Sequence, residues 1–263
     1  MKGSWALVTG ATSGIGLEIA KLHASNSGNL ILASRDLYKL EQTQKQLIKK
    51  FEIDVKIIQI DLSIENAAES LYLNIKELDL EIEYLINNAG FGGYGFFQQR
   101  DQINDLEMIR LNIITLTMLM HLFLKDFVVR KHGKILNVSS SAALMPGPMQ
   151  AVYFATKAYV KSLTNAVARE VKSTGVTITN LMPAPTKTAF IQRSNVIGSK
   201  MFRDLADPKT IALEGYSGML EGKLNILSGF NFWQKIRLKI IPLVPENIIL
   251  NFVYKAQNKE FKN

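Results

Sequence analysis

The sequence predicts an α/β fold in which one doubly wound parallel sheet carries helices on both faces. Three observations indicate it. Short apolar runs alternate with longer amphipathic stretches from residue 4 to residue 182. The apolar runs lack the every-second-residue polarity of a sheet with one wet face, so helices must cover both faces. The chain has 263 residues, 47% hydrophobic and 21% charged, which suits a single globular domain.

The elements follow one another in strict strand–helix order, which requires parallel βαβ units with right-handed crossovers. We expect strands at 4–9, 29–34, 55–60, 84–88, 134–139 and 176–182, alternating with helices at 15–27, 36–50, 64–78, 104–130 and 149–173. The stretch 36–50 is charged and amphipathic, as a helix on the surface of a sheet would be. The most apolar stretch, 111–124, is shorter than the roughly 20 residues that span a bilayer, so it predicts a buried helix.

The alternation breaks at Pro183 and Pro185, after the sixth strand. Residues 186–205 show no clear period and predict a long loop or short helices. Asp207 followed by Pro208 has the pattern of an N-cap and first helical position, so a helix is expected to run to about residue 221, before a seventh strand at 224–227. We assign 1–190 to a cofactor-binding and catalytic core, and 191–263 to a substrate-binding loop and helix plus a basic amphipathic extension of the same domain.

Composition excludes several classes of function. The chain has no cysteine, which rules out a disulfide scaffold, a zinc ribbon and a thiol nucleophile, and is compatible with a reducing compartment. The three histidines lack metal-ligand spacing, so no metal is expected. The N-terminal apolar run is too short for a secretory signal, so we expect a cytoplasmic location.

The formal net charge of +8 is unevenly placed. Residues 1–185 carry 19 basic against 17 acidic side chains, whereas residues 186–263 carry 12 against 6. Such a surface could meet nucleic acid, anionic lipid or a phosphorylated ligand. No nucleic-acid-binding motif appears, so no nucleic-acid partner is expected.

A glycine-rich stretch, Thr9 to Gly16, directly follows the first strand and opens a helix. Its spacing is G-x-x-x-G-x-G, whereas the ordinary dinucleotide fingerprint is G-x-G-x-x-G. Glycines here let backbone N–H groups approach a phosphate, and the helix N-terminus adds partial positive charge. A turn that merely needs glycines is the alternative, but the strand before and the helix after favour phosphate binding.

The end of the second strand predicts the choice of dinucleotide. An acidic residue there binds the ribose hydroxyls of NAD, whereas an arginine nearby accommodates the 2′-phosphate of NADP. Here Ser34 stands at the acidic position and Arg35 follows, which favours NADP(H) over NAD(H). Two alternatives stay open: Arg35 could be a solvated helix-capping side chain, and a small change of register would put Asp36 where the phosphate should go.

Tyr153 and Lys157 are four residues apart on a predicted helix and therefore share a face. A tyrosine needs a nearby cation to exchange protons at neutral pH, because its ordinary pKa is about 10. Alone this pair is common on protein surfaces. The serines 139–141 end the fifth strand, at the sheet edge where open α/β folds bind ligands, although a serine cap is the alternative.

Taken together, these motifs resemble the classical short-chain dehydrogenase/reductase family, over residues 1–190 and in the family's order. Ser140 precedes Tyr153 by 13 residues, as in the family. The resemblance implies a Rossmann-type sheet, a nicotinamide cofactor and the catalytic set Asn112, Ser140, Tyr153 and Lys157. With the residues above, it implies a cofactor-binding set of Gly10, Thr12, Ser13, Gly14, Ile15, Gly16, Ser34, Arg35, Asp61, Leu62, Asn88, Ala89, Gly90, Tyr153, Lys157, Pro183 and Thr188.

The implied mechanism is hydride transfer to a carbonyl carbon while Tyr153 donates a proton to the oxygen and Ser140 stabilises the developing charge. Lys157 would favour the phenolate and bind the nicotinamide ribose, and Asn112 would hold a water that links Lys157 to solvent. Two positions depart from the family. Ala184 replaces the usual glycine after Pro183, and Ser13 stands where many NADP-preferring members have a basic residue.

The sequence therefore predicts an NADP-dependent short-chain dehydrogenase/reductase that acts on a carbonyl or alcohol substrate, which we expect to be apolar. The alternatives are a cofactor-binding regulatory protein without turnover and a peripheral-membrane reductase of a lipid-derived substrate. The long apolar helices and the resemblance predict a homodimer or homotetramer. The aromatic and basic stretch 230–241 predicts either a lid over the substrate or weak peripheral membrane contact. The loop 91–97 either lines an apolar cleft or simply turns the chain.

Overall fold

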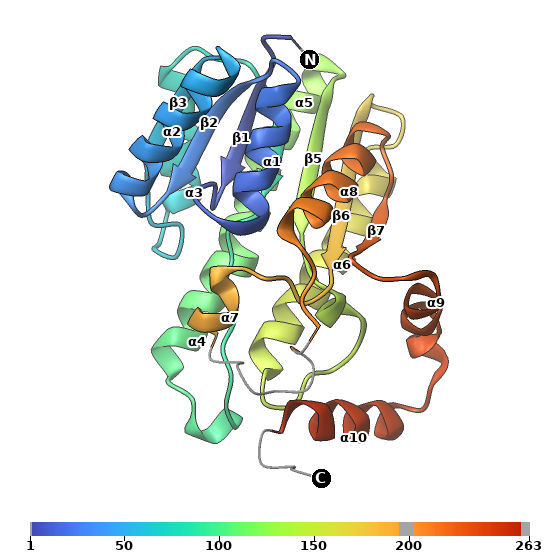
Figure 1. Ribbon diagram of the computed structural model, residues 1–263. Helices are drawn as coiled ribbons and strands as arrows, with labels where there is room; N and C mark the ends of the chain where they lie inside the picture. Colours follow the sequence, from blue (N-terminus) through green and yellow to red (C-terminus); the bar gives the residue numbers. More distant parts are fainter. Residues whose placement is uncertain (1, 195–201, 203, 259–263) are drawn as a thin grey trace.

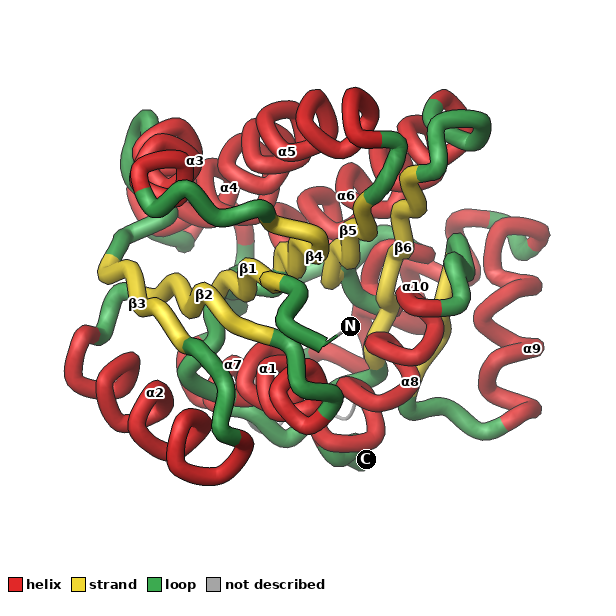
Figure 2. The backbone as a smooth tube through the Cα atoms, turned by 90° about the horizontal axis from the view of Figure 1, so that it is seen from above, coloured by secondary structure: helices red, strands yellow, loops and turns green. Residues whose placement is uncertain are grey.

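Seven parallel strands form the centre of the molecule, in the order β3-β2-β1-β4-β5-β6-β7 (Figures 1 and 2). This computed structural model describes residues 2–194, 202 and 204–258. The strands are β1 (Trp5–Thr9), β2 (Asn29–Ser34), β3 (Val55–Gln59), β4 (Ile82–Asn87), β5 (Gly133–Val138), β6 (Val176–Pro183) and β7 (Asn225–Ser228). The strand order reverses between β1 and β4, and open α/β sheets bind ligands in the crevice at such a point.

Helices cover both faces of the sheet, as the unbroken apolar strands require (Figure 2). One face carries α1 (Gly14–Ser25), α2 (Leu37–Phe51) and α8 (Pro208–Leu220), and the other carries α3 (Ala67–Glu77), α5 (Leu116–Arg130) and α6 (Ala151–Glu170). The remaining helices are α4 (Gln102–Ile109), α7 (Ala189–Arg193), α9 (Phe232–Ile240) and α10 (Glu246–Gln257), with short turns at η1 (Phe97–Gln99), η3 (Ser141–Leu144) and η5 (Ile241–Leu243). The predicted doubly wound sheet is confirmed.

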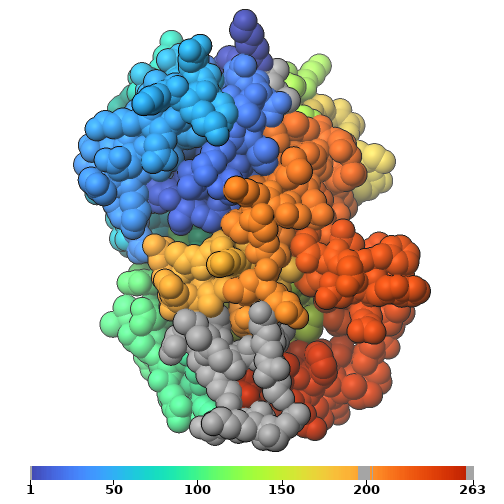
Figure 3. Space-filling model, in the orientation of Figure 1, coloured from blue at the N-terminus to red at the C-terminus, as the bar shows by residue number. Residues whose placement is uncertain are grey.

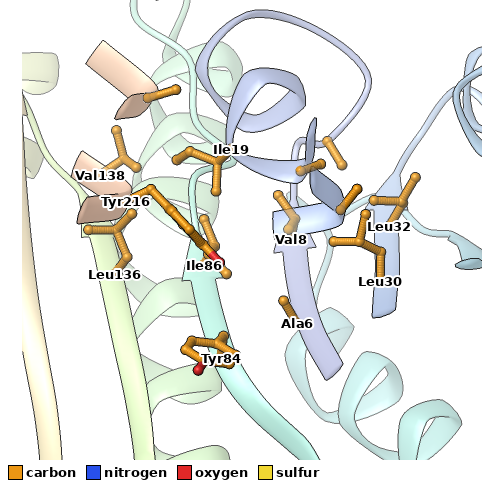
Figure 4. Close-up of a cluster of buried hydrophobic side chains, with 14 of the residues drawn as sticks. Ala6, Val8, Ile19, Leu30, Leu32, Tyr84, Ile86, Leu136, Val138 and Tyr216 are labelled. Carbon is orange, nitrogen blue, oxygen red and sulfur yellow. The ribbon is translucent and has the colours of Figure 1, made fainter. Parts of the chain in front are cut away.

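Two apolar clusters fix the sheet between its helix layers. In the cluster drawn in Figure 4, Val8 and Ile86 of the central strands meet Ile19 of α1 and Tyr216 of α8. All four side chains are almost fully buried. Burial of this kind contributes roughly 25 cal/mol per Å² of apolar surface, which is why the central strands hold the ligand-binding edge rigidly. Because α8 and β7 belong to this core, residues 208–228 return to the sheet after the loop that precedes them.

The predicted helix 104–130 is a continuous helical segment with an irregular centre. It consists of α4, a π-helical turn η2 (Arg110–Thr115) and α5. Its inner face packs against β4, β5 and α3. Within the described chain, Gln102–Arg130 is the one helix whose length and composition would allow it to cross a membrane. Of its apolar 18-residue stretch, 39% is buried inside the molecule. Core helices of soluble proteins pass the same test, so it is a weak sign.

Several boundaries differ from the sequence prediction. Helix α3 begins at Ala67, three residues late, because Asn66 has a positive φ of 58° that no helical residue adopts. Helix α6 is shorter than 149–173 at both ends, and Met149 has a φ of 66°. Of the stretch 186–205, the structure places the short helix α7, and residues 195–201 and 203 lie outside the described part.

Candidate active site

A cavity of about 1200 Å³ opens at the carboxyl ends of the strands. Its walls come from the glycine loop, the ends of β2, β4, β5 and β6, the helix α6, and the C-terminal helices α9 and α10. Seventeen of the predicted site residues line it, namely Gly10, Thr12, Ser13, Gly14, Ile15, Ser34, Arg35, Asp61, Leu62, Asn88, Ala89, Gly90, Ser140, Tyr153, Lys157, Pro183 and Thr188. Gly16 and Asn112 are the two predicted site residues that do not line it.

The glycine loop is braced from beneath by Asn88. The Asn88 side-chain amide donates to the carbonyls of Thr9 (2.9 Å) and Gly10 (3.2 Å), and the Thr9 hydroxyl accepts from the backbone N–H of Asn88 (3.0 Å). A Cβ at Gly16 would lie 2.4 Å from the Asn88 amide nitrogen, so this glycine allows the helix to approach the loop closely. Gly14 has a φ of 58° and leaves no room for a Cβ beside Thr188. The glycines thus leave an open cradle at the N-terminus of α1, the geometry that receives a phosphate.

At the end of β2, cationic side chains gather at the cavity wall. Arg35, Lys39 and Arg193 all line it. The carboxylate of Asp36 does not occupy the site as a ribose ligand, because it caps α2, accepting from the Lys39 backbone N–H (3.0 Å) and pairing with the Lys39 ammonium (2.8 Å). The hydrogen bond with Lys39 lowers the pKa of Asp36.

Asp61 lies beside Arg35, one of these cationic side chains. Burial opposes ionisation of its carboxyl, but hydrogen bonds from the Ser63 hydroxyl (2.6 Å) and backbone N–H (2.9 Å), together with Arg35, lower its pKa. The Arg35 guanidinium lies 3.7 Å from that carboxylate. The Ser34 hydroxyl lies 3.2 Å from the Thr12 hydroxyl, so the position where an NAD enzyme carries an acid is neutral here.

Ser140, Tyr153 and Lys157 meet at the base of the cavity. The Ser140 hydroxyl caps η3, accepting from the Ala142 backbone N–H (3.1 Å), and hydrogen-bonds Tyr153. Burial raises the pKa of Tyr153 to about 12, which the bond from Ser140 partly opposes. The phenol therefore carries its proton at neutral pH, the form that an acid in carbonyl reduction needs.

Lys157 is buried beside Tyr153. Its ammonium donates to the Val138 carbonyl (2.9 Å) and lies 5.9 Å from the centre of the Tyr153 ring. Burial lowers the pKa of Lys157 to about 8, so it is mostly cationic at neutral pH. A Cβ on Gly90 would lie 3.4 Å from this ammonium, which shows how closely the end of β4 approaches the lysine.

Asn112 lies in the π-helical turn behind the cavity wall, almost fully buried. Its amide donates to the Phe91 carbonyl (3.0 Å) and the Thr156 hydroxyl (3.1 Å), and its side-chain oxygen accepts from the Phe91 backbone N–H (3.3 Å). The side chain is therefore fully used in joining three elements. The water-holding role of Asn112 stays a prediction, and the residue lies in a π turn of the kind that recurs at functional sites.

Gln150, three residues before Tyr153, is a cavity residue that was not among the predicted site residues. This side chain is 1% exposed, lines the cavity, and has no hydrogen-bond partner for either amide atom. Buried polar groups without partners are uncommon, and one in a cavity wall is suited to a ligand. The sequence prediction placed Gln150 inside a helix at 149–173, whereas it is the N-cap of α6, and the orientation of its side chain could not be predicted.

The apolar part of the cavity comes from segments far apart in the chain. Phe190 of α7 lies 5.2 Å from Tyr153, ring centre to ring centre. Phe91 also lines the cavity, whereas Phe97 is 70% exposed and away from it, so each alternative for the loop 91–97 holds for part of it. From the tail, the lining residues are Phe230, Gln234, Arg237, Leu238, Ile241, Val244, Ile248, Ile249, Phe252 and Ala256.

Comparisons with known proteins agree with this geometry. The family described as short chain dehydrogenase matches residues 4–196. The chain is 33% identical over 198 residues to the very-long-chain 3-oxoacyl-CoA reductase of Mus musculus, covering 73% of this chain and 62% of that protein. It is also 33% identical to a very-long-chain 3-oxoacyl-CoA reductase-like protein of Arabidopsis thaliana, over 94% of this chain and 79% of that protein. The chain thus spans less than two thirds of the length of the mouse protein.

Solved structures show the same architecture. A short-chain dehydrogenase from Sphingobium yanoikuyae in complex with NADPH superposes with a TM-score of 0.82 and 25% identity, covering 92% of this chain and 97% of that one.

Proposed function

This chain belongs to the short-chain dehydrogenase family, and from that premise we propose that it transfers hydride between NADP(H) and an apolar carbonyl or alcohol substrate. The observation that carries the proposal is the meeting of Ser140, Tyr153 and Lys157 in the cavity that also contains the glycine cradle. A cofactor-binding protein without turnover needs the cradle but has no use for a proton donor and a buried lysine beside it.

The residues fit a nicotinamide dinucleotide. A Cβ at Gly10, Gly14 or Gly16 would collide with neighbouring protein atoms, so glycine is required for the shape of this loop. Gly10 and Gly14 line the cavity, where their backbone would receive a pyrophosphate. Arg35, with Lys39 beside it, is placed to receive a 2′-phosphate. When bound, the nicotinamide supplies the hydride, and the protein supplies position, protons and electrostatics.

In reduction, the substrate oxygen is held by the hydroxyls of Ser140 and Tyr153. Tyr153 donates its proton to that oxygen, and Ser140 stabilises the charge that develops there, a contribution of about 2.7–4 kcal/mol for one such donor. The cationic Lys157 stabilises the phenolate that remains and is positioned to contact the nicotinamide ribose. The proton that Tyr153 has given up is then replaced through a water held at the π turn by the Asn112 backbone.

For the substrate, we propose a 3-oxoacyl thioester with an aliphatic chain. The cavity that Tyr153 lines is also lined by aliphatic side chains of the tail, Leu238, Ile241, Val244, Ile248 and Ile249, which suits a long hydrocarbon chain. Such a substrate has a second carbonyl two carbons from the reacting one, and the unpaired Gln150 amide is a donor for it. The names of the mouse and Arabidopsis relatives support this class.

The test is oxidation of NADPH, followed by absorbance, with a series of 3-oxoacyl-CoA substrates of increasing chain length and with cyclic ketones as a comparison. We expect kcat/KM to rise with chain length, and Tyr153→Phe to remove turnover. Preference for the cyclic ketones would refute the thioester assignment but leave the reductase intact. Absence of turnover with every substrate, together with normal NADPH binding, would support the regulatory alternative.

We also propose that the chain forms a homodimer through the helical segment 102–130 and α6. Ile103, Leu106, Ile114 and Val129 are more than half exposed on the first of these, and Tyr159 is exposed on α6. For its location, we propose the cytoplasm, with peripheral contact to a membrane.

A further inference from the structure

Large exposed apolar side chains gather on the C-terminal arm, which we define as residues 230–258. Six of them lie within 21 residues: Phe232, Trp233, Ile240, Leu243, Ile248 and Phe252, with exposed fractions between 46% and 82%. Single exposed apolar residues are ordinary on protein surfaces, but a concentration of them marks a surface that meets something else.

Helix α9 carries an apolar face that is turned away from the cavity. Gln234, Arg237 and Leu238 line the cavity. At 100° per residue, Phe232, Trp233, Ile236 and Ile240 fall on the other side of the helix. No residue of α9 is buried, and Figures 1 and 3 show the helix at the edge of the molecule, projecting from the body. A helix that only roofs a cavity would turn its apolar face inward, whereas the apolar face of α9 points outward and serves no packing role inside the described molecule.

The arm is nevertheless fixed to the body. Val253 of α10 is completely buried in a cluster with Tyr153 and Phe154. The Tyr94 hydroxyl donates to the Gln257 carbonyl (2.8 Å). The start of α9 is secured by a complete capping box between Asn231 and Gln234. The exposed aromatics are therefore held in place by ordered structure and do not belong to a frayed terminus.

The charges on the arm indicate which partner the outer face of α9 would bind. Lys235 and Lys239 flank the outer apolar face of α9, and among the described residues neither has a carboxylate within 4 Å. A symmetric dimer through this face would bring two copies of the patch together, so four lysines without carboxylate partners would enter one interface. A negatively charged lipid surface instead takes aromatics at its interface and lysines on its headgroups.

We propose that the outer face of α9 and the turn after it, formed by Phe232, Trp233, Ile240 and Leu243 with Lys235 and Lys239, is a docking surface for anionic phospholipid membranes. The inner face of the same helix lines the cavity, so docking would place the mouth of the active site next to the bilayer. The proposal goes beyond the proposed reaction, since binding to a membrane requires no turnover.

Co-sedimentation with phosphatidylcholine vesicles, with and without phosphatidylserine, tests it on the full-length protein. We expect binding to the phosphatidylserine vesicles that weakens as salt rises. The double variant Trp233→Ser, Leu243→Ser should lose at least tenfold in affinity. Lys235→Gln and Lys239→Gln should each lose about fivefold, the factor that corresponds to about 1 kcal/mol per base.

Matched controls separate this surface from a general loss of apolar area or of folding. Leu73→Ser, Leu213→Ser removes two exposed leucines from α3 and α8 and should bind like wild type. Neither Trp233 nor Leu243 lines the cavity, so the arm variant should keep its unfolding temperature and NADPH binding. Tyr153→Phe should bind vesicles normally, which separates docking from catalysis.

Three results would overturn the proposal. One is no binding of the intact protein to phosphatidylserine vesicles at low salt. Another is binding that survives in the Trp233, Leu243 double variant. The third is self-association of the wild type that the same double variant abolishes, without vesicle binding, because a second copy of the chain would then be the occupant.

Discussion

At the scale of single residues, the active site places a phenol and an ammonium together in a buried pocket. Burial acts on the two groups in opposite directions, raising the pKa of Tyr153 to about 12 and lowering that of Lys157 to about 8. In each case burial favours the neutral form. A protonated phenol is ready for reduction, and the lysine keeps most of its charge only below pH 8.

Tyr153→Phe should reduce kcat to background while leaving NADPH affinity nearly unchanged, because only the proton-donating hydroxyl is lost. Ser140→Ala should reduce kcat by about 10²–10³, the loss typical of one donor to a developing oxyanion. Single-turnover kinetics and fluorescence titration of NADPH check the two parameters separately. Near-normal turnover by the Tyr153 variant would mean that another group is the acid.

Arg35→Ala should raise the KM for NADPH at least tenfold and change the KM for NADH little, because the guanidinium would meet only the 2′-phosphate. Steady-state kinetics with both cofactors check this. Equal effects on the two, or a wild-type preference for NADH, would exclude the assignment of Arg35. Lys21→Ala changes another partly exposed basic residue with an acidic neighbour, so it is the control and should affect neither value.

Lys157 makes stability depend on pH in a defined direction. Its pKa is about 8 when folded and about 10.4 in an unfolded chain, so below pH 8 it destabilises the folded state, and this effect fades as the pH rises toward 10. Between pH 8 and pH 10, the free energy of unfolding of the wild type should therefore rise relative to that of Lys157→Met, by up to about 1.4 kcal/mol per pH unit. Thermal or urea unfolding of both proteins from pH 7 to pH 10 measures the difference, and a constant difference would contradict the lowered pKa.

At the scale of elements, strands were predictable because their signal is local. The predicted 29–34 is β2 as found, and most other strands agree within one or two residues. The π turn in 110–115 leaves no trace in apolar periodicity. The convergence of Gln150, Phe190 and the tail on one cavity was also hidden, because each side chain is placed by packing between distant segments. The resemblance to a family named most of the site residues, and the structure brings 17 of them to one cavity, although their roles stay predictions.

The glycine loop can be tested as an element. Gly14→Ala should weaken NADPH binding at least tenfold, since the added Cβ would lie 2.9 Å from the Thr188 side chain at a position with a φ of 58°. Gly3→Ala is the matched control, because Gly3 also has a positive φ, of 77°, but has nothing within 4 Å of the added carbon. Calorimetric titration should show wild-type affinity for the control and reduced affinity for Gly14→Ala.

At the scale of the whole molecule, two surfaces are left apolar, and they face different partners. The helical segment 102–130 and α6 cover one face of the sheet, and the hydroxyls of Thr117 and Tyr159 lie 3.2 Å apart where α5 and α6 run together. The proposed dimer uses this surface because large apolar side chains such as Ile114 and Val129 are more than half exposed on it.

Sedimentation should therefore give about twice the chain mass of 29.4 kDa at micromolar concentration. Ile114→Asp, at a half-exposed position of this surface, should yield monomers, because a symmetric dimer would bury two carboxylates together. A wild-type monomer in the same experiment would refute the interface. The arm variant Trp233→Ser, Leu243→Ser should remain dimeric.

The outer face of α9 also gives the molecule an optical probe of its own. The chain contains two tryptophans, Trp5 in β1 and Trp233 on α9, and the second is 69% exposed. With Trp5→Phe, the emission of a single indole would report the surroundings of that helix alone. An indole that moves from water into an apolar layer emits at shorter wavelength. The emission maximum of Trp233 would therefore show, in real time, when an apolar layer covers the helix.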